Sequence, residues 1–291
     1  MATFQRHRLT PWILLAPQLA VIAVFFFWPA AQAIVQAFYI EDPFGLGHEF
    51  VWFENFARIF TSFEYLRALG VTALFSVSVA VGAMSLALLL AVQADRVIHG
   101  AHSYKTLLIW PYAVAPAVAG VLWMFMFDPN LGLLSAGLEN LGIGWNHRVN
   151  GGQAMLLVIL ASIWKQMSYN FVFFLAGLQS IPKSLLEAAA IDGAGPWRRF
   201  WTVTFPLLSP TSFFLLVMNS VYVFFETFGT IDATTGGGPG GATRTLVYKV
   251  YEDGFEGYDL GSSAAQSVIL LILVGLLTLL QFRYIERKVQ Y

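Results

Sequence analysis

Six stretches of the sequence are long and apolar enough to cross a membrane as helices. The hydrocarbon core of a bilayer is about 30 Å thick, which a helix of about 20 residues spans. Backbone polar groups in lipid need partners within the segment, so helices are favoured over isolated strands. We predict helices at Trp12–Ala37, Ala68–Val92, Leu107–Phe127, Gln153–Leu178, Leu208–Phe228 and Ala264–Tyr284. The sequence therefore predicts an all-α integral membrane protein with six transmembrane helices.

The composition supports lipid as the main solvent of the chain. Hydrophobic residues make up 57% of the 291 residues and charged residues only 11%, whereas soluble domains carry about 25% charged residues. The net charge of −1 gives no reason to expect a nucleic-acid partner. Cysteine is absent, which excludes disulfides and thiolate metal sites.

The first apolar stretch has an alternative interpretation as a signal peptide. Arg6 and Arg8 precede it, and Pro29–Ala33 resembles a signal-peptidase site. The apolar run Trp12–Trp28 is longer than the 7–15 residues typical of a signal peptide. We therefore expect a retained helix at residues 12–37.

The distribution of basic residues predicts that both termini lie in the cytoplasm. With the N-terminus inside, ten basic residues fall on the cytoplasmic side and five on the opposite side, as the positive-inside rule requires. The ten are Arg6, Arg8, Arg96, Lys105, Lys183, Arg198, Arg199, Arg283, Arg287 and Lys288. The five are Arg58, Arg67, Arg148, Arg244 and Lys249.

A cytoplasmic stretch between the fourth and fifth predicted helices has the pattern of a short, well-capped helix. Within Ile181–Pro196, Pro182 suits the first helical position. Gly193 suits the position just past the helix end, where a left-handed conformation is needed. We predict a second short helix at Trp197–Trp201 that ends before Pro206. Neither helix is long enough to span a membrane.

The spacing of residues in this stretch resembles the EAA loop of binding-protein-dependent ABC importer permeases, written E-A-A-x3-G-x9-I-x-L-P. The matching residues are Glu187, Ala188, Ala189, Gly193 and Val203-Thr204-Phe205-Pro206. The chain departs from the pattern conservatively, with Val203 for Ile and Phe205 for Leu. The resemblance implies that Glu187, Ala188, Ala189, Asp192 and Gly193 form a coupling helix that docks on an ATP-hydrolysing subunit.

The resemblance covers essentially the whole chain, including Trp110–Ala119 and Trp164–Phe171, and is greatest to permeases of sn-glycerol-3-phosphate importers. It implies the type I importer permease fold in one domain, residues 1–291. That domain would have an extra N-terminal helix (12–37), core helices (68–284) and a coupling loop (179–207). The implied location is the bacterial inner membrane.

The resemblance also implies partners: a second homologous permease, two ATP-binding cassette subunits that carry ATP and Mg²⁺, and a periplasmic substrate-binding protein. The chain itself would bind no cofactor and would not be an enzyme. It contains no G-x-x-x-x-G-K-[ST] phosphate loop, so another chain must bind ATP. The implied substrate is sn-glycerol-3-phosphate or a related glycerophosphodiester. The alternative is a sugar or oligosaccharide, as in maltose-type importers.

Polar residues within the predicted helices are candidates for the translocation path. Lys165 lies about 18 Å along its helix, near the middle of the bilayer, where a lysine is costly and often functional. The other candidates are Gln166, Tyr169, Asn170, Asn219 and Tyr222. Alternatively, Lys165 is a structural partner of another helix or of backbone carbonyls. We expect Glu226 to lie about 14 Å from Lys165 in depth, too far for an ion pair.

Two further features leave alternatives open. The run Thr235–Gly241 contains five glycines and forms either a flexible exterior turn or a shaped loop that meets a soluble partner. His99 and His102 are spaced as metal ligands on one helical turn, but a solvated loop is the simpler interpretation.

Overall fold

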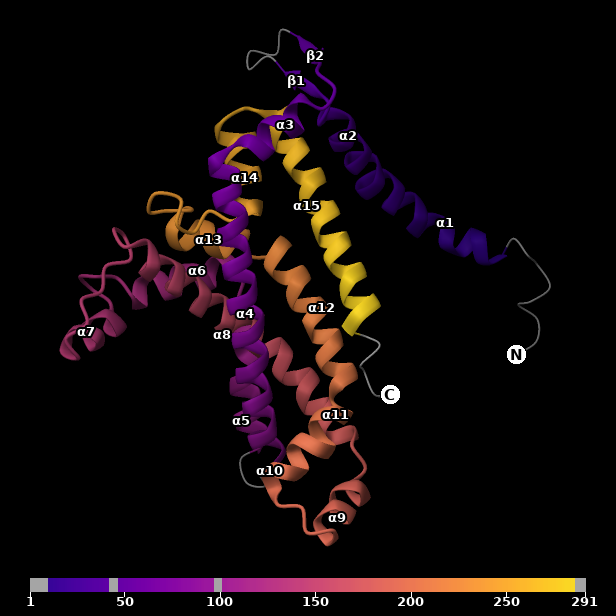
Figure 1. Ribbon diagram of the computed structural model, residues 1–291, viewed down its shortest axis with the longest axis vertical. Helices are drawn as coiled ribbons and strands as arrows, with labels where there is room; N and C mark the ends of the chain where they lie inside the picture. Colours follow the sequence, from indigo (N-terminus) through magenta and orange to yellow (C-terminus); the bar gives the residue numbers. More distant parts are fainter. Residues whose placement is uncertain (1–9, 42–46, 97–100, 286–291) are drawn as a thin grey trace. The chain divides into compact units, whose positions relative to one another are not determined.

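The computed structural model describes residues 10–41, 47–96 and 101–285 (Figure 1). In these ranges four helices are long and apolar enough to cross a membrane: Pro11–Gln36, Phe63–Asp95, Gly151–Ser180 and Leu260–Arg283. Two further spans are possible as bent helix pairs, Ser103–Ala113 with Pro116–Met126 and Pro196–Leu207 with Ser209–Phe225. The chain divides into two compact units, Met1–Ser62 with Val250–Leu271 and Phe63–Lys249 with Ile272–Tyr291. The single domain expected from the sequence stays a prediction.

The first unit begins with one long helix in which no residue from Pro11 to Gln36 is buried. It comprises α1 (Thr10–Ile22), a π-helical turn (Ala23–Phe27) and α2 (Trp28–Gln36). The wider π turn lies directly before Pro29, whose ring and missing N–H disturb the helical hydrogen bonds. The candidate span Pro11–Gln36 is 0% buried, which suits a helix that faces lipid or a partner.

A small hairpin and a short helix follow in the same unit. Strands β1 (Tyr39–Glu41) and β2 (His48–Phe50) are antiparallel, with Tyr39 opposite Phe50. Helix α3 (Glu54–Thr61) follows the hairpin and buries Asn55 and Ile59.

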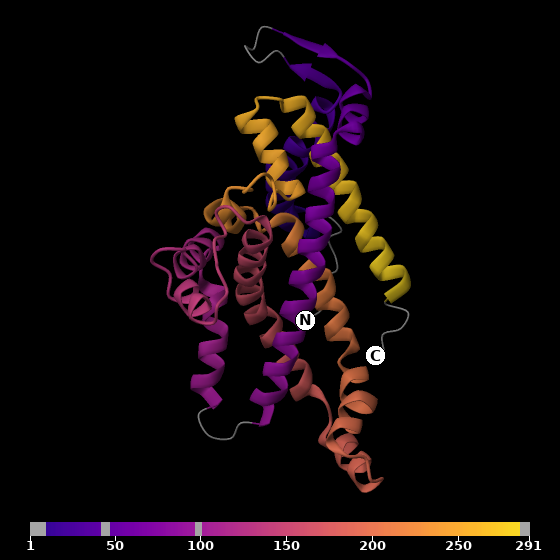
Figure 2. The ribbon, with the colours of Figure 1, turned by 60° about the vertical axis from the view of Figure 1, so that its left-hand side comes forward.

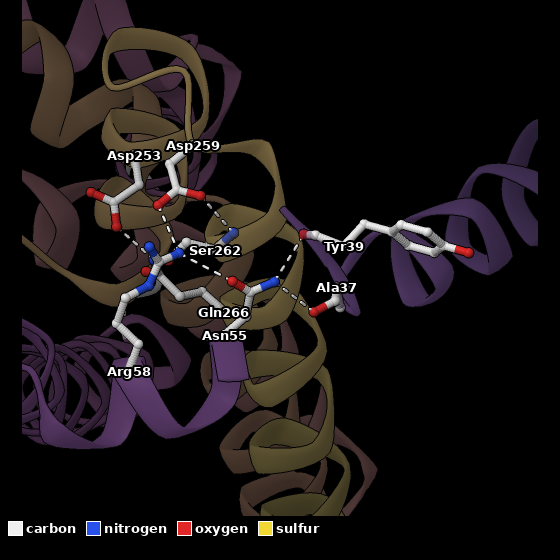
Figure 3. Close-up of polar contacts among 8 residues, drawn as sticks. All are labelled: Ala37, Tyr39, Asn55, Arg58, Asp253, Asp259, Ser262 and Gln266. Carbon is white, nitrogen blue, oxygen red and sulfur yellow. Dashed lines mark hydrogen bonds and ion pairs between the residues drawn. The ribbon is translucent and has the colours of Figure 1, made fainter. Parts of the chain in front are cut away.

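Helix α15 (Leu260–Leu280) starts in this unit within a polar network (Figure 3). Asp259 accepts a hydrogen bond from the backbone N–H of Ser262 at 3.0 Å, which caps the helix N-terminus. The same carboxylate pairs with Arg58 of α3 at 2.9 Å. Gln266 on the next turn donates to Asp253 of the π-helical turn Glu252–Glu256 at 2.5 Å.

The second unit is built on two long helices that run side by side, α4 (Phe63–Arg96) and α8 (Gly151–Ser180) (Figures 1 and 2). The face of α4 that meets α8 carries small residues, and Ala83, Ala87 and Ala91 are all fully buried. Gly82 lies so close to Ile163 of α8 that a Cβ would collide with its side chain. Small residues let helix backbones approach closely, which is how helices associate in lipid.

The third predicted span, Leu107–Phe127, is broken rather than straight. Helix α5 (Ala101–Ile109) continues as a 3₁₀ turn (Trp110–Ala113), and α6 (Pro116–Met126) leaves at 104°. Pro116 lacks an N–H and forces the preceding residue out of the helical region, so Val114 and Ala115 are extended. Helix α6 packs on α13 (Phe228–Thr235) at Gly120, where a Cβ would lie 2.9 Å from the Thr230 carbonyl oxygen.

The fifth predicted span, Leu208–Phe228, is shorter and is preceded by a second bend. Helix α12 (Ser209–Phe225) follows α10 (Pro196–Arg199), a π-helical turn (Phe200–Thr204) and α11 (Phe205–Leu207) at an angle of 65°. The prediction that the second short helix ends before Pro206 is wrong. The helix continues to Leu207 because the wide π turn accommodates the proline.

Buried apolar residues of α4, α8 and α12 form the core of this unit, and α13 and α14 (Leu246–Tyr251) contribute to it. Helix α7 (Leu133–Asn140) and α9 (Lys183–Ile191) lie in the connections, and a π-helical turn (Gln281–Ile285) follows α15. The largest fully buried side chains of this core are Phe75, Phe171, Phe174, Leu157, Leu208 and Leu215.

Candidate functional site

The capped cytoplasmic helix predicted from the sequence is α9. It begins at Lys183, so Pro182 is the cap residue and not the first helical residue as expected. Gly193 has a φ of +79°, as predicted for the position past the helix end. Its N–H donates to the carbonyl of Ala190 at 3.1 Å, and the N–H of Ala194 reaches back to Ala189 at 3.0 Å. These bonds satisfy carbonyls that the end of a helix leaves without partners.

The surface of α9 is unusually open, since none of its residues is buried. Glu187, Ala188, Asp192 and Gly193 are exposed and Ala189 is half-buried. Ile191, which the sequence did not single out, is 87% exposed. A large apolar side chain displayed beside an acid and small residues is the composition of a docking surface.

A hollow lies beside this helix, and two opposite charges face it. Asp95 at the end of α4 and Arg199 of α10 both line it, together with Leu186 of α9. A neighbouring hollow adds Lys183 and Glu187 to the same charged pair. The end of α9 is thus part of a polar, grooved surface.

Lys165 is buried, with 8% of the residue exposed, and it contacts the break in the third predicted span. Its Nζ donates to the carbonyl of Val114 at 2.9 Å and to that of Tyr112 at 3.3 Å. The same nitrogen lies 5.4 Å from the centre of the Tyr112 ring. These carbonyls lie where the helix ends and cannot find helical partners, and a cation is favoured at a helix C-terminus. The geometry is that of the structural alternative that the sequence left open.

The two candidate asparagines bind one another. Asn170 of α8 and Asn219 of α12 are fully buried and exchange hydrogen bonds of 3.2 and 2.8 Å. Asn219 also donates to the carbonyl of Leu215 at 2.7 Å. Gln166 and Tyr222 are buried nearby on the same two helices. The pair satisfies its own polar groups and ties α8 to α12.

Tyr169 contacts the same tyrosine as Lys165, and Glu226 lies at the end of α12. The Tyr169 ring lies 5.7 Å from that of Tyr112 and 4.8 Å from that of Phe173. Glu226 is exposed and is the C-cap residue of α12. The separation of about 14 Å in depth between Lys165 and Glu226 stays a prediction.

The glycine-rich run at 235–241 is a packed turn. Gly236 and Gly237 have positive φ, and Gly237 lies against the Tyr248 ring, where a Cβ would collide with ring carbons. The hydroxyl of Thr243, a residue only 1% exposed, donates to the carbonyl of Gly238 at 3.0 Å. These contacts favour the shaped loop over the flexible turn. As to metals, His99 lies outside the described residues, and within those ranges no three His or acidic residues are grouped as ligands.

Comparisons with known proteins agree with this architecture. A curated relative, the sn-glycerol-3-phosphate transport system permease protein UgpA of Rhizobium meliloti (strain 1021), is 59% identical over 285 residues, which cover 98% of this chain and 97% of the relative. Among solved structures, a chain of a bacterial ABC transporter that imports the acidic polysaccharide alginate superposes with a TM-score of 0.83 at 20% identity. It covers 95% of both chains.

The same transporter bound to its alginate pentasaccharide-loaded periplasmic protein gives a TM-score of 0.82 at 20% identity, covering 96% of this chain and 95% of the other. The fold is therefore that of a type I ABC importer permease. Residues 8–291 match the family described as "Binding-protein-dependent transport system inner membrane component". The chain belongs to this family of ABC importer permeases.

Proposed function

We propose that the chain is the channel-forming permease subunit of an importer for sn-glycerol-3-phosphate or related glycerophosphodiesters. The observation that carries the proposal is the 59% identity to a glycerol-3-phosphate permease along 98% of the chain. The alternative is a sugar or oligosaccharide permease of the maltose type. The alginate importer shares the fold but only 20% of the sequence, so it supports no substrate.

The importer would contain a second homologous permease, two ATP-binding cassette subunits and a periplasmic binding protein. ATP and Mg²⁺ would be held by the cassette subunits, and this chain would hydrolyse nothing. It would lie in the bacterial inner membrane with both termini in the cytoplasm. The exposed face of α9 supports a cassette partner, since it leaves apolar surface such as Ile191 to be covered.

We place the translocation path along the polar group on α8 and α12. Its residues are Lys165, Gln166, Tyr169, Asn170, Asn219 and Tyr222. Support comes from Lys165 and Tyr169, which both contact Tyr112 at the break in the third span. Backbone at membrane depth departs from a helix only where protein or a water-filled cavity covers it. The ammonium of Lys165 uses two of its three donors on the carbonyls of Val114 and Tyr112, and the third could meet a phosphate ester, which a neutral sugar would not need.

Uptake by the reconstituted importer tests the substrate. Vesicles would carry the chain with its partner subunits and internal ATP, and the binding protein would be added outside with labelled sn-glycerol-3-phosphate. We expect ATP-dependent uptake that unlabelled glycerol-3-phosphate abolishes and excess maltose leaves unchanged. Uptake of labelled maltose, with none of the phosphate ester, would establish the alternative.

Two substitutions in α9 test coupling. Gly193→Val places a β-branched residue at φ +79° and should distort the end of α9. Gly195→Val is the matched control, because a Cβ meets open space at both positions but Gly195 has φ −64°. Glu187→Ala should remove a charge-assisted contact with the cassette subunit. We expect the Gly193 and Glu187 variants to insert normally but to bind less cassette subunit and to lose substrate-stimulated ATP hydrolysis. Normal assembly and coupled hydrolysis in both would refute the role of α9.

Cysteine labelling tests the topology, since the chain has no native thiol. Thr243 lies in the predicted outer loop but is buried and unsuitable for labelling. Exposed Glu139 and Lys183 are better probes of the two sides. An impermeant maleimide added to cells should label Glu139→Cys, and it should label Lys183→Cys only after the inner face is opened. The reverse pattern would invert the proposed orientation.

A further inference from the structure

The first unit contains a groove between the last turns of its long helix and the hairpin. It has a volume of about 720 Å³. Trp28, Ala31 and Val35 of α2 line one part of it, and Tyr39 and Glu41 of β1 line another. Gln32 and Gln36 of α2 line it too, so Trp28, Ala31 and Val35 form an apolar part on a mixed helix side, and Glu41 and His48 make the hairpin side polar.

The polar network holds the two sides of this groove in place. The buried amide of Asn55 donates to the carbonyl of Ala37 at 3.0 Å and to that of Tyr39 at 2.9 Å, at the turn between α2 and β1 (Figure 3). Arg58 donates to the Asn55 side-chain oxygen at 3.1 Å and also pairs with Asp259. The hairpin is therefore fixed to the helix end by bonds to backbone atoms, and the groove is a built feature.

The chain itself sets the depth of the groove in the bilayer. The hairpin begins three residues after Gln36, where the candidate span ends, so it lies at the membrane surface. Trp28 lies about 12 Å further along the helix, at the depth of the upper acyl chains. Tyr39, at the start of the hairpin, is an aromatic type that favours membrane interfaces. The apolar part of the groove thus lies in hydrocarbon and the polar part at the level of the headgroups.

We propose that this groove binds a phospholipid with an ammonium headgroup. One acyl chain would lie along the apolar side chains of α2, and the ammonium would meet the carboxylate of Glu41. Gln36 donates to one oxygen of that carboxylate at 2.7 Å and orients it, while the half-exposed carboxylate keeps capacity to accept from the lipid. His48 lies at the same end of the groove and can donate to the lipid phosphate.

Site-selective quenching tests the proposal in the assembled importer, with the other subunits made cysteine-free. Gln32 lines the groove and is exposed, so Gln32→Cys carries a fluorophore. Val21 on the same span is 55% exposed outside the groove, and Val21→Cys is the matched control. The vesicles contain brominated phosphatidylethanolamine or brominated phosphatidylglycerol at equal mole fraction. We expect stronger quenching by the ethanolamine lipid at position 32, with an apparent affinity ratio of about two- to fivefold, as one exposed charge contact gives.

The charge of Glu41 provides the second arm. Glu41→Gln should abolish the preference at position 32 and leave quenching at position 21 unchanged, which also shows that the variant is folded. Equal quenching by both lipids at position 32, or a preference that survives Glu41→Gln, would overturn the proposal. Absence of quenching by either lipid at position 32 would also overturn it and would show that another subunit fills the groove.

Discussion

Replacement of Lys165 by Met is the most informative perturbation of the membrane core. Methionine is similar in length and apolar, so it fills the space of the lysine stem but donates no hydrogen bond. The carbonyls of Val114 and Tyr112 then lose the donor that lies at 2.9 and 3.3 Å. Because the helix is broken at this point, neither carbonyl has a helical partner to replace it.

The expected cost follows from these two bonds. A buried acceptor left without a donor costs about 1–3 kcal/mol, so two of them should lower the free energy of unfolding by roughly 2–6 kcal/mol. An ammonium within the membrane costs free energy in the folded state and also in the inserted state whose helices are not packed. Removing the ammonium relieves both states, so it offsets little of the lost stability. Lys165→Arg keeps charge and donors and should cost less than the Met substitution.

Denaturation with sodium dodecyl sulfate, followed by helical circular dichroism on the purified chain, measures this loss. Lys183→Met is the control, because Lys183 is an exposed lysine of α9. We expect Lys165→Met to unfold at clearly lower detergent fraction, with Arg intermediate and the control unchanged. Unfolding of the Met variant at the native detergent fraction would refute the capping role. Impaired uptake of the phosphate ester at unchanged stability would leave Lys165 with the proposed path role alone.

Two further predictions concern other parts of the second unit. Gly120→Ala should loosen α6 from α13 and lower the thermal midpoint of unfolding, because its Cβ would lie 2.9 Å from a backbone oxygen. Gly137→Ala in α7 is the control and should be neutral or stabilising, since a Cβ there meets open space. Equal midpoints for the two variants would contradict the close contact at Gly120. The loop at 128–150 should lose protection from hydrogen exchange as the pH falls. Burial, followed by the Arg148 charge, lowers the pKa of His147 below 6.5, and the backbone N–H of Asn130 leads the groups that lower the pKa of Asp128 below 3.8. His147 and Asp128 bind protons less readily in the folded chain than in the unfolded chain, so both stabilise the fold fully above about pH 6.5. As the pH falls, the contribution of His147 is lost first and that of Asp128 next. Exchange rates in this loop, corrected for intrinsic pH dependence, that stay constant from pH 7 to 4 would refute the effect.

Local chemistry in the sequence was sufficient for the features that depend on it. Gly193 was assigned a left-handed conformation from its place after an apolar and small-residue run, and its φ is +79°. The long apolar stretches predicted the spans within a few residues, since bilayer thickness fixes their length. The start of α9 was misplaced by one residue, because Pro182 fits a cap position as well as the first turn.

The bends were predictable in part, but the partner of Lys165 was not. Pro116 lies inside the predicted helix Leu107–Phe127, and a proline disfavours a helical conformation at the residue before it. The length of an apolar stretch predicts a span but does not show such a break. The carbonyls that Lys165 binds are 51 and 53 residues away in sequence, and no local pattern connects them to it.

The contact between Lys165 and the broken span also implies an order of assembly. The carbonyls at the C-terminal end of α5 and its 3₁₀ turn lie within a candidate span, where lipid offers no hydrogen-bond donor. Their donor comes from α8, which follows later in the chain, so the bend cannot be satisfied until α8 has packed beside it. The polar group on α8 thus stabilises a backbone shape on another span that neither span could keep alone. A lysine ammonium without acceptors and backbone carbonyls without donors each cost free energy within a membrane. The hydrogen bonds between them reduce both costs, which explains why the lysine and the break occur at the same depth.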